Sequence, residues 1–253
     1  MTNLVSLKAA YAAVFGLAFM TSAFEAKSNA ETDSFTGSVT FASDYVYRGI
    51  SQSSSQAAYT GTAEYSHAIT SNYNVFVGGF ISNVDFSDGD LTNVEVSPSV
   101  GIEGQKSEFS WRILAYYDIY PGAPSRVHYN YYGFDTNFSR DFGLVQLSFE
   151  AGVDPNLFGN SGTGVYAGLD ATIPLPNIPL APNIVLHSGR QSIERNAFYQ
   201  APDYVDWALE LNADIQSVHL ALRYSDTDIP RPQCFGGSRV CGERVVVSLG
   251  WTF

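Results

Sequence analysis

The last nine residues, Val245-Val-Val-Ser-Leu-Gly-Trp-Thr-Phe253, alternate between apolar side chains and small or polar ones. On a β-strand the five apolar residues share one face and the other four share the opposite face. An exposed terminal Phe253 on a soluble protein buries nothing and frays. In a membrane barrel such a residue is favourable, because apolar side chains point outward to lipid and small or polar ones point into the barrel. The stretch therefore predicts the closing strand of a transmembrane β-barrel.

The final three residues, Trp251-Thr-Phe253, also resemble a known signal. The assembly machinery of bacterial outer-membrane barrels reads a last strand that ends in aromatic-x-aromatic, although Ser248 replaces the glycine usual farther upstream. The resemblance implies the barrel-assembly machinery and outer-membrane lipid as partners. It also implies the cell outer membrane of a Gram-negative bacterium as the location.

Such a location requires export, and residues 1–30 have the pattern of a signal peptide. Lys8 precedes the apolar run Ala9–Phe24, which is short and rich in small residues for a membrane span. Small residues place candidate cleavage sites after Ala23 and after Ala30. A membrane-anchoring helix is the alternative. We therefore assign residues 1–30 to a signal peptide and residues 31–253 to one barrel domain.

The composition of the remaining chain agrees with a membrane barrel. Without Lys8, Lys27 and Glu25, the 13 basic and 25 acidic residues fall to 11 and 24, a net charge of −13. This acidity argues against nucleic acid as a partner. The chain is 14% aromatic and 15% charged, and it has no long apolar helix after the signal region. That combination is typical of a transmembrane β-barrel; a secreted β-sandwich is the alternative.

Alternation with period two divides the chain into twelve candidate strands. Short turns follow the even-numbered strands and longer polar loops follow most odd-numbered ones, as in bacterial barrels. The predicted fold is all-β, an antiparallel up-and-down barrel of about twelve strands. Ten or fourteen strands remain open, because the third and ninth segments are weak. The predicted ranges are 35–49, 57–69, 73–86, 92–103, 108–120, 128–139, 144–154, 164–173, 182–190, 204–215, 218–227 and 243–253.

Aromatic residues fall where the two membrane interfaces are expected. Amphipathic rings favour those levels. The predicted outer ends of the strands carry Tyr45, Tyr47, Tyr59, Tyr117 and Trp207. The predicted inner ends carry Phe109, Trp111, Phe138, Trp251 and Phe253.

Three stretches resemble a known family. The first is Thr40-Phe-Ala-Ser-Asp-Tyr-Val-Tyr-Arg-Gly-Ile-Ser-Gln52, and the others are Ala63-Glu-Tyr-Ser-His67 and Ser82-Asn-Val-Asp-Phe86. Together they resemble the TorF-type porin family of bacterial outer-membrane proteins, whose substrate is generally unassigned. The resemblance implies a barrel and a porin-like function, and it identifies no permeant.

The inward face of the predicted strands is rich in carboxylates. The candidate pore-lining residues are Asp44, Arg48, Glu64, Glu95, Arg112, Asp118, Glu150, Asp170, Asp206, Glu210 and Arg223. The same parity adds Glu103, Asp135, Asp154, Asp214, Arg244 and, less regularly, Arg190. Twelve acids then face five arginines, an excess of about seven negative charges in a confined space. Rings of carboxylates bias a pore toward cations; pairing of these groups into a filled, non-conducting interior is the alternative.

Asp44 and Arg48 need a separate interpretation. Strand residues four apart lie roughly 13 Å from each other, so these two cannot pair directly on one strand. We expect Arg48 to pair instead with Asp85, two strands away, or with a carboxylate on a loop. Such a pair acts either as a pore constriction or as a structural clamp, and we favour the clamp.

Cys234 and Cys241 bracket a Gly-Gly pair in the last long loop. In an oxidising compartment this spacing predicts a small disulfide, worth roughly 2–3 kcal/mol on the chain-entropy model. The four histidines lie far from these cysteines in the sequence. We therefore expect no metal site and no cofactor.

An enzyme is the third functional class to consider. Some outer-membrane barrels hydrolyse lipids with Ser and His on the outer wall, and parity places His67, and less clearly His128, on that wall. The neighbouring Ser66 points inward, and the sequence contains no G-x-S-x-G elbow. We therefore expect no enzyme.

We expect a monomeric or weakly oligomeric porin-like channel for passive diffusion of small polar or cationic solutes. A non-conducting structural or surface-binding barrel with a plugged lumen is the alternative.

Overall fold

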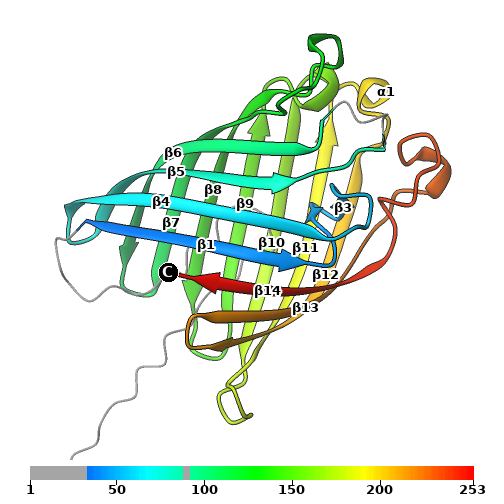
Figure 1. The fold of residues 1–253 in the computed structure, drawn as a ribbon. Helices are drawn as coiled ribbons and strands as arrows, with labels where there is room; N and C mark the ends of the chain where they lie inside the picture. The colour runs from blue at the N-terminus through cyan, green and yellow to red at the C-terminus, as the bar shows by residue number, and fades with distance from the viewer. Residues whose placement is uncertain (1–32, 88–91) are drawn as a thin grey trace, which may run out of the picture.

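The computed structural model describes residues 33–87 and 92–253, and it forms a closed antiparallel barrel of twelve strands (Figure 1). Each strand pairs with its neighbours in sequence, and β14 returns to pair with β1. The predicted signal peptide lies outside the described residues. The wall strands are β1 (Ser34–Ala42), β4 (Ala58–Thr70), β5 (Tyr73–Asn83), β6 (Val94–Lys106), β7 (Phe109–Asp118), β8 (Tyr131–Asp141), β9 (Gln146–Asp154), β10 (Gly164–Pro174), β11 (Asn183–Ile193), β12 (Tyr204–Ile215), β13 (Val218–Thr227) and β14 (Arg244–Thr252).

The seam between β1 and β14 closes the barrel. The paired residues run from Ser38 opposite Thr252 to Ala42 opposite Ser248. Beyond the last ladder pair, Gly37 and Phe253 exchange two backbone hydrogen bonds of 2.9 Å each. Because every wall strand then has a partner on both sides, the sheet presents no open edge to lipid. The prediction of a closing strand at the C-terminus is confirmed.

The wall is apolar on the outside and polar on the inside. On β14, Val247, Leu249 and Trp251 are 50–58% exposed and point outward. The parity of β5, ambiguous in the sequence, is resolved by packing. Phe76 and Phe80 point inward and are buried, and Gly101 opposite Phe76 leaves room for the ring, since a Cβ there would lie 2.5 Å from Phe76 Cζ. No helix among residues 33–87 and 92–253 is long and apolar enough to span a membrane.

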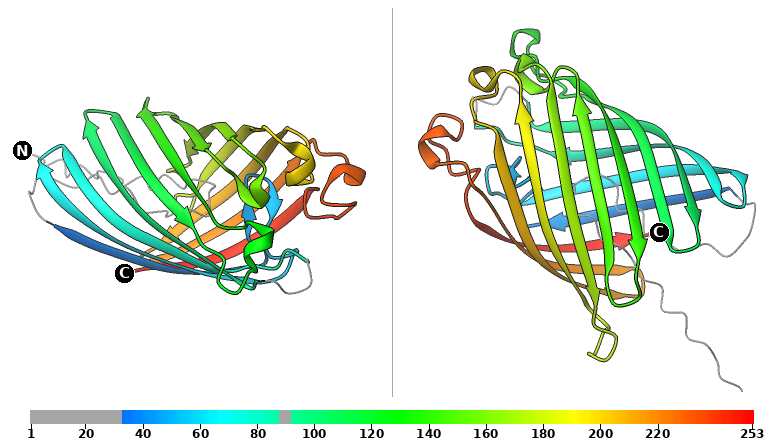
Figure 2. Two further views of the ribbon diagram at one scale, coloured as in Figure 1. Left: turned by 90° about the horizontal axis from the view of Figure 1, so that it is seen from above. Right: turned by 180° about the vertical axis from the view of Figure 1, so that it is seen from behind.

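The connections differ between the two ends of the barrel, as predicted. The turn end carries residues 71–72, 107–108, 142–145, 175–182 and 216–217. The loop end carries residues 43–57, 84–87, 92–93, 119–130, 155–163, 194–203 and 228–243. Short helical segments lie in these loops: η1 (Ser125–Val127), η2 (Phe158–Asn160), α1 (Asn196–Tyr199) and η3 (Arg231–Gln233). Figure 2 shows the loops gathered at one end of the ring.

The first predicted strand, residues 35–49, is too long. β1 ends at Ala42, and the chain then leaves the wall and turns into the interior. Residues 44–48 continue the alternating pattern because they enter a small hairpin, whose two strands also have period two. Asp44 and Arg48 are therefore interior residues, but they do not lie on a wall strand as predicted.

Candidate functional site in the barrel interior

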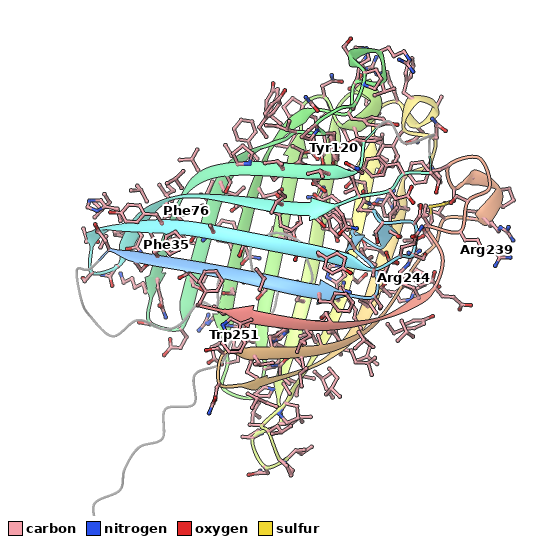
Figure 3. The ribbon with its side chains drawn as sticks, in the orientation of Figure 1. Phe35, Phe76, Tyr120, Arg239, Arg244 and Trp251 are labelled. Atoms are coloured by element: carbon pink, nitrogen blue, oxygen red, sulfur yellow. A yellow bond between two sulfur atoms is a disulfide. The ribbon has the colours of Figure 1, made fainter. Side chains whose placement is uncertain are left out.

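Residues 43–57 form a plug segment inside the loop end of the barrel. It contains β2 (Val46–Tyr47) and β3 (Ile50–Ser51), which form a separate two-stranded sheet. The Asp44 carboxylate organises the base of the segment, because it accepts hydrogen bonds from Ser51 Oγ at 2.6 Å and Ser53 Oγ at 2.8 Å. Arg244 Nη1, at the start of β14, donates to the same carboxylate at 2.9 Å (Figure 3). The base is thus held by its own serines and by the seam.

Arg48 lies at the tip of the plug segment and reaches the opposite wall. Its backbone is left-handed (φ 46°), and its side chain is only 2% exposed. The guanidinium lies 3.4, 3.5 and 3.6 Å from carboxylate oxygens of Asp135, Glu150 and Asp154, respectively. It also donates to Gln191 Oε1 at 3.1 Å. Because β8 and β9 lie across the ring from β1, Arg48 ties the plug segment to the far side of the barrel.

The predicted partner of Arg48, Asp85, is not among these contacts. Asp85 instead pairs through its backbone with the plug segment at Ser53, and its Oδ2 accepts a hydrogen bond from Gln56 at 3.3 Å. The true partners escaped sequence reasoning because Arg48 was placed on the wall. Asp135, for example, lies 87 positions further along the chain.

A second interior cluster surrounds His187 on β11. His187 Nδ1 lies 2.8 Å from Asp170 Oδ1, and Nε2 lies 2.9 Å from Asp206 Oδ1. The Tyr166 hydroxyl lies 3.0 Å from the same Nε2, and the Tyr166 ring lies 4.2 Å from the Arg48 guanidinium carbon. An imidazole that carries a positive charge donates from both nitrogens. The two flanking carboxylates therefore fit a protonated His187, and Tyr166 lies between this residue and Arg48.

The remaining predicted interior arginines are also paired. Arg112 Nη1 donates to Glu103 Oε2 at 2.7 Å, and Arg112 Nη2 donates to Glu64 Oε2. The guanidinium also covers the Phe76 ring, 3.5 Å from its centroid. Arg223 Nη1 donates to Glu210 Oε2 at 3.1 Å. Arg112 therefore pairs with carboxylates on β6 and β4, and Arg223 pairs with one on the adjacent strand β12.

Glu95 and Asp118 form a different kind of site, because no ion pair in the described part of the chain reaches either carboxylate. They are 3% and 1% exposed. Ser97 Oγ donates to Asp118, and hydroxyls of Tyr45 and Tyr120 bond to Glu95. Glu95 Oε2 and Asp118 Oδ2 have no hydrogen-bond partner. Two buried carboxylates without a protein cation are costly.

The whole interior is strongly acidic. Among the described residues it holds four arginines, Arg48, Arg112, Arg223 and Arg244, together with His187. Arg190, assigned inward by parity, is instead exposed on the outer wall, opposite Ala167 and Val205. Asp214 has the inward parity of β12 but lies at the turn end, where its side chain is 43% exposed. The interior carboxylates are Asp44, Glu64, Glu95, Glu103, Asp118, Asp135, Glu150, Asp154, Asp170, Asp206 and Glu210.

Apolar side chains fill the loop end around the plug segment. Tyr45 and Ile50 of the plug pack with inward wall residues such as Phe80, Tyr116 and Tyr131. The loops contribute Leu157, Ala201, Ile229, Cys234 and Cys241 to the same cluster, and the two cysteines form the predicted disulfide.

The prediction that Tyr45 and Tyr47 belong to an interfacial belt is wrong, because the chain turns inward before them. Tyr59, Tyr117 and Trp207 do point outward and are 38–64% exposed.

The loops at this end are also tied to one another. Glu194 Oε2 accepts a hydrogen bond from the Thr163 backbone N–H at 2.7 Å, which holds the pKa of that carboxyl below its ordinary value. The Phe235 N–H donates to the Gln200 carbonyl at 2.9 Å. Three successive loops thus close over the plug segment as one packed layer.

The two histidines considered for hydrolysis are not placed as a catalytic pair. His67 points outward at the turn end, where its Nδ1 lies 2.7 Å from Asp33 Oδ1. His128 belongs to the loop before β8, not to a strand, and is exposed. The described contacts of His67 involve a carboxylate and not a serine hydroxyl. The geometry offers no support for a hydrolase on the outer wall within residues 33–87 and 92–253.

An apolar outer wall, a polar interior and a closed ring of antiparallel strands define a transmembrane β-barrel. The chain belongs to the Gcw_chp family, described as bacterial proteins of unknown function, whose model matches residues 25–253. No curated protein matches the chain. This family carries no assigned function, so the likeness to TorF-type porins stays a prediction.

Several solved structures share the fold. One, from a study of the in-meso crystallization of membrane proteins, has a TM-score of 0.52 at 10% identity, covering 87% of this chain and 83% of the other. An outer membrane channel from Pseudomonas putida F1 has a TM-score of 0.49 at 10% identity, covering 86% and 94%. Outer membrane phospholipase A from Escherichia coli has a TM-score of 0.49 at 9% identity, covering 85% and 92%. At 10% identity, the likeness to the first of these structures concerns the fold alone.

Proposed function

We propose that the protein is a narrow outer-membrane channel for small cations and small polar solutes in a Gram-negative bacterium. The observation that carries this proposal is the excess of carboxylates over cationic groups inside the barrel. In a sealed structural barrel such an excess is costly, because unpaired buried carboxylates lose their hydration. Mobile cations that enter from either side supply the missing counter-charge.

The charge distribution along the interior supports a continuous path for cations. Glu64 and Glu103 lie toward the turn end, Glu150 and Asp170 lie in the middle, and Glu95 and Asp118 lie toward the loop end. Successive carboxylate sites of this kind bind a cation at one level and release it to the next. The candidate pore-lining residues thus fit a selectivity pathway, in which Arg112 limits the net charge beside Glu64 and Glu103 and Arg223 limits it beside Glu210.

A second candidate is favoured by a different observation. The packed layer at the loop end, with Tyr45, Phe80 and Tyr131 each at most 6% exposed, fits a barrel that does not conduct. In that case the loops present a binding surface and the ion pairs serve only to fill the interior. The two candidates differ in one measurable property, the passage of ions.

We expect the purified, refolded protein to give unitary current steps in planar lipid bilayers. The steps are expected to be small, because a twelve-stranded barrel is narrower than the sixteen-stranded barrels that leave an aqueous channel. Glu64→Gln, in the barrel interior, is expected to lower the cation current without closing the channel. The non-conducting candidate would be established if neither the folded wild type nor a folded variant with the plug segment released gives current at either polarity.

A further inference from the structure

We propose that the three carboxylates of Asp135, Glu150 and Asp154 form the main cation site of the channel, and that Arg48 closes the channel by occupying this site. The inference rests on the proposed function and assigns both its ligand and its gate. The ligand is a small monovalent cation, and the gate is the plug segment, residues 43–57.

The first observation is the mismatch between three acids and one guanidinium. The distances of 3.4–3.6 Å exceed the 2.7–2.9 Å typical of charge-assisted hydrogen bonds. Both Glu150 carboxylate oxygens and Asp154 Oδ2 make no hydrogen bond, although both residues are at least 95% buried. Arg48 is therefore a loosely fitting cation in a site that has coordination capacity to spare.

The second observation is that the tip and the base of the plug segment are held differently. The base depends on Asp44, Ser51 and Ser53, which bond within the segment, and on Arg244 of the seam strand. The Arg48 side chain joins the tip to the far wall through its ion pairs and its hydrogen bond to Gln191. Loss of these contacts frees the Arg48 side chain from the far wall while the hydrogen bonds of the base remain.

The third observation is the backbone at the tip. Arg48 and Gly49 both adopt positive φ, at 46° and 77°. A non-glycine residue pays a conformational penalty there, and such positions persist only when surrounding contacts hold them. Gly49 packs closely against β12 and β13, since a Cβ there would lie 2.5 Å from Thr227 Cγ2 and 2.8 Å from Asp206 Cβ. The ion pairs of Arg48 hold this strained turn in place, so their loss favours release.

The test compares wild type, Arg48→Ala and Arg239→Gln in planar bilayers. Arg239 is exposed on the loop between β13 and β14 (Figure 3), so its variant controls for the loss of one positive charge at the loop end. Arg48→Ala is expected to raise the open population by about tenfold or more, the shift produced by loss of one hydrogen bond to a charged group. Arg239→Gln is expected to resemble wild type.

Added guanidinium chloride gives a second readout. It is expected to block the Arg48→Ala channel by filling the vacated site and to leave wild type unaffected, and Glu150→Gln in the same background should weaken the block. If Arg48→Ala does not fold, the triple variant Asp135→Asn, Glu150→Gln, Asp154→Asn removes the three carboxylates that pair with Arg48 and so also releases the tip. Equal conduction by wild type and Arg48→Ala, with no guanidinium block of Arg48→Ala, would overturn this inference alone. Folded released variants that carry no current would overturn the channel itself.

Discussion

Deletion of Trp251, Thr252 and Phe253 is expected to lower the yield of folded barrel by more than about tenfold, because each unpaired backbone group in hydrocarbon costs several kcal/mol. These residues pair on both sides. Trp251 lies opposite Val39 of β1 and Val218 of β13. The Thr252 N–H donates to the Ser217 carbonyl, and Phe253 bonds to Gly37. Their loss leaves the turn end of the seam open.

The measurement is the fraction of protein that keeps its compact, heat-modifiable gel mobility after refolding into detergent or liposomes. Phe253→Tyr is the control, since it retains the backbone pairing and an aromatic ring. Refolding without cellular components separates seam closure from recognition by the assembly machinery, which we propose as a second role of the same residues. Equal yields for the deletion and the full chain would show that the seam does not need this segment.

Replacement of His187 by Ala is expected to destabilise the barrel by about 3–5 kcal/mol, the cost of removing one partner from a buried ion pair. The variant leaves Asp170 and Asp206 facing each other without the cation between them. Both the histidine and its two partners have side chains that are at most 4% exposed. Water cannot easily replace the lost interaction.

His219→Ala is the matched control for this prediction. His219 Nδ1 lies 2.7 Å from Asp214 Oδ1, as close as the pairs of His187, but the two side chains are 24% and 43% exposed. An exposed pair is worth less than about 1 kcal/mol. Urea unfolding of both variants in liposomes, followed by tryptophan fluorescence, measures the difference. Similar losses at the two positions would show that burial does not set the strength of the His187 cluster.

Much of the wall was predictable because period-two alternation survives wherever one face meets lipid and the other meets polar groups. The segments 204–215 and 218–227 coincide with β12 and β13. Parity also placed most interior acids correctly, since a strand fixes which side each residue faces. Arg190 is the exception among the arginines and lies in a weakly patterned strand, where the sequence pattern constrains the side chain least.

The plug segment was not predictable from local pattern. A hairpin that enters the interior alternates just as a wall strand does, so residues 44–48 appeared to extend β1. The partners of Arg48 come from β8 and β9, which meet the segment only after the ring closes. Which residues pair across a barrel depends on the curvature of the whole sheet. The separation of two residues in the sequence does not reveal whether they meet across the ring.

The most direct test of the central claim is the reversal potential of the refolded channel in a KCl gradient across a planar bilayer. In the described part of the chain, eleven interior carboxylates face four arginines and His187, which predicts a reversal potential close to the equilibrium potential of K⁺. A value near zero, or one displaced toward the equilibrium potential of Cl⁻, would contradict the account of an acid-lined, cation-preferring channel.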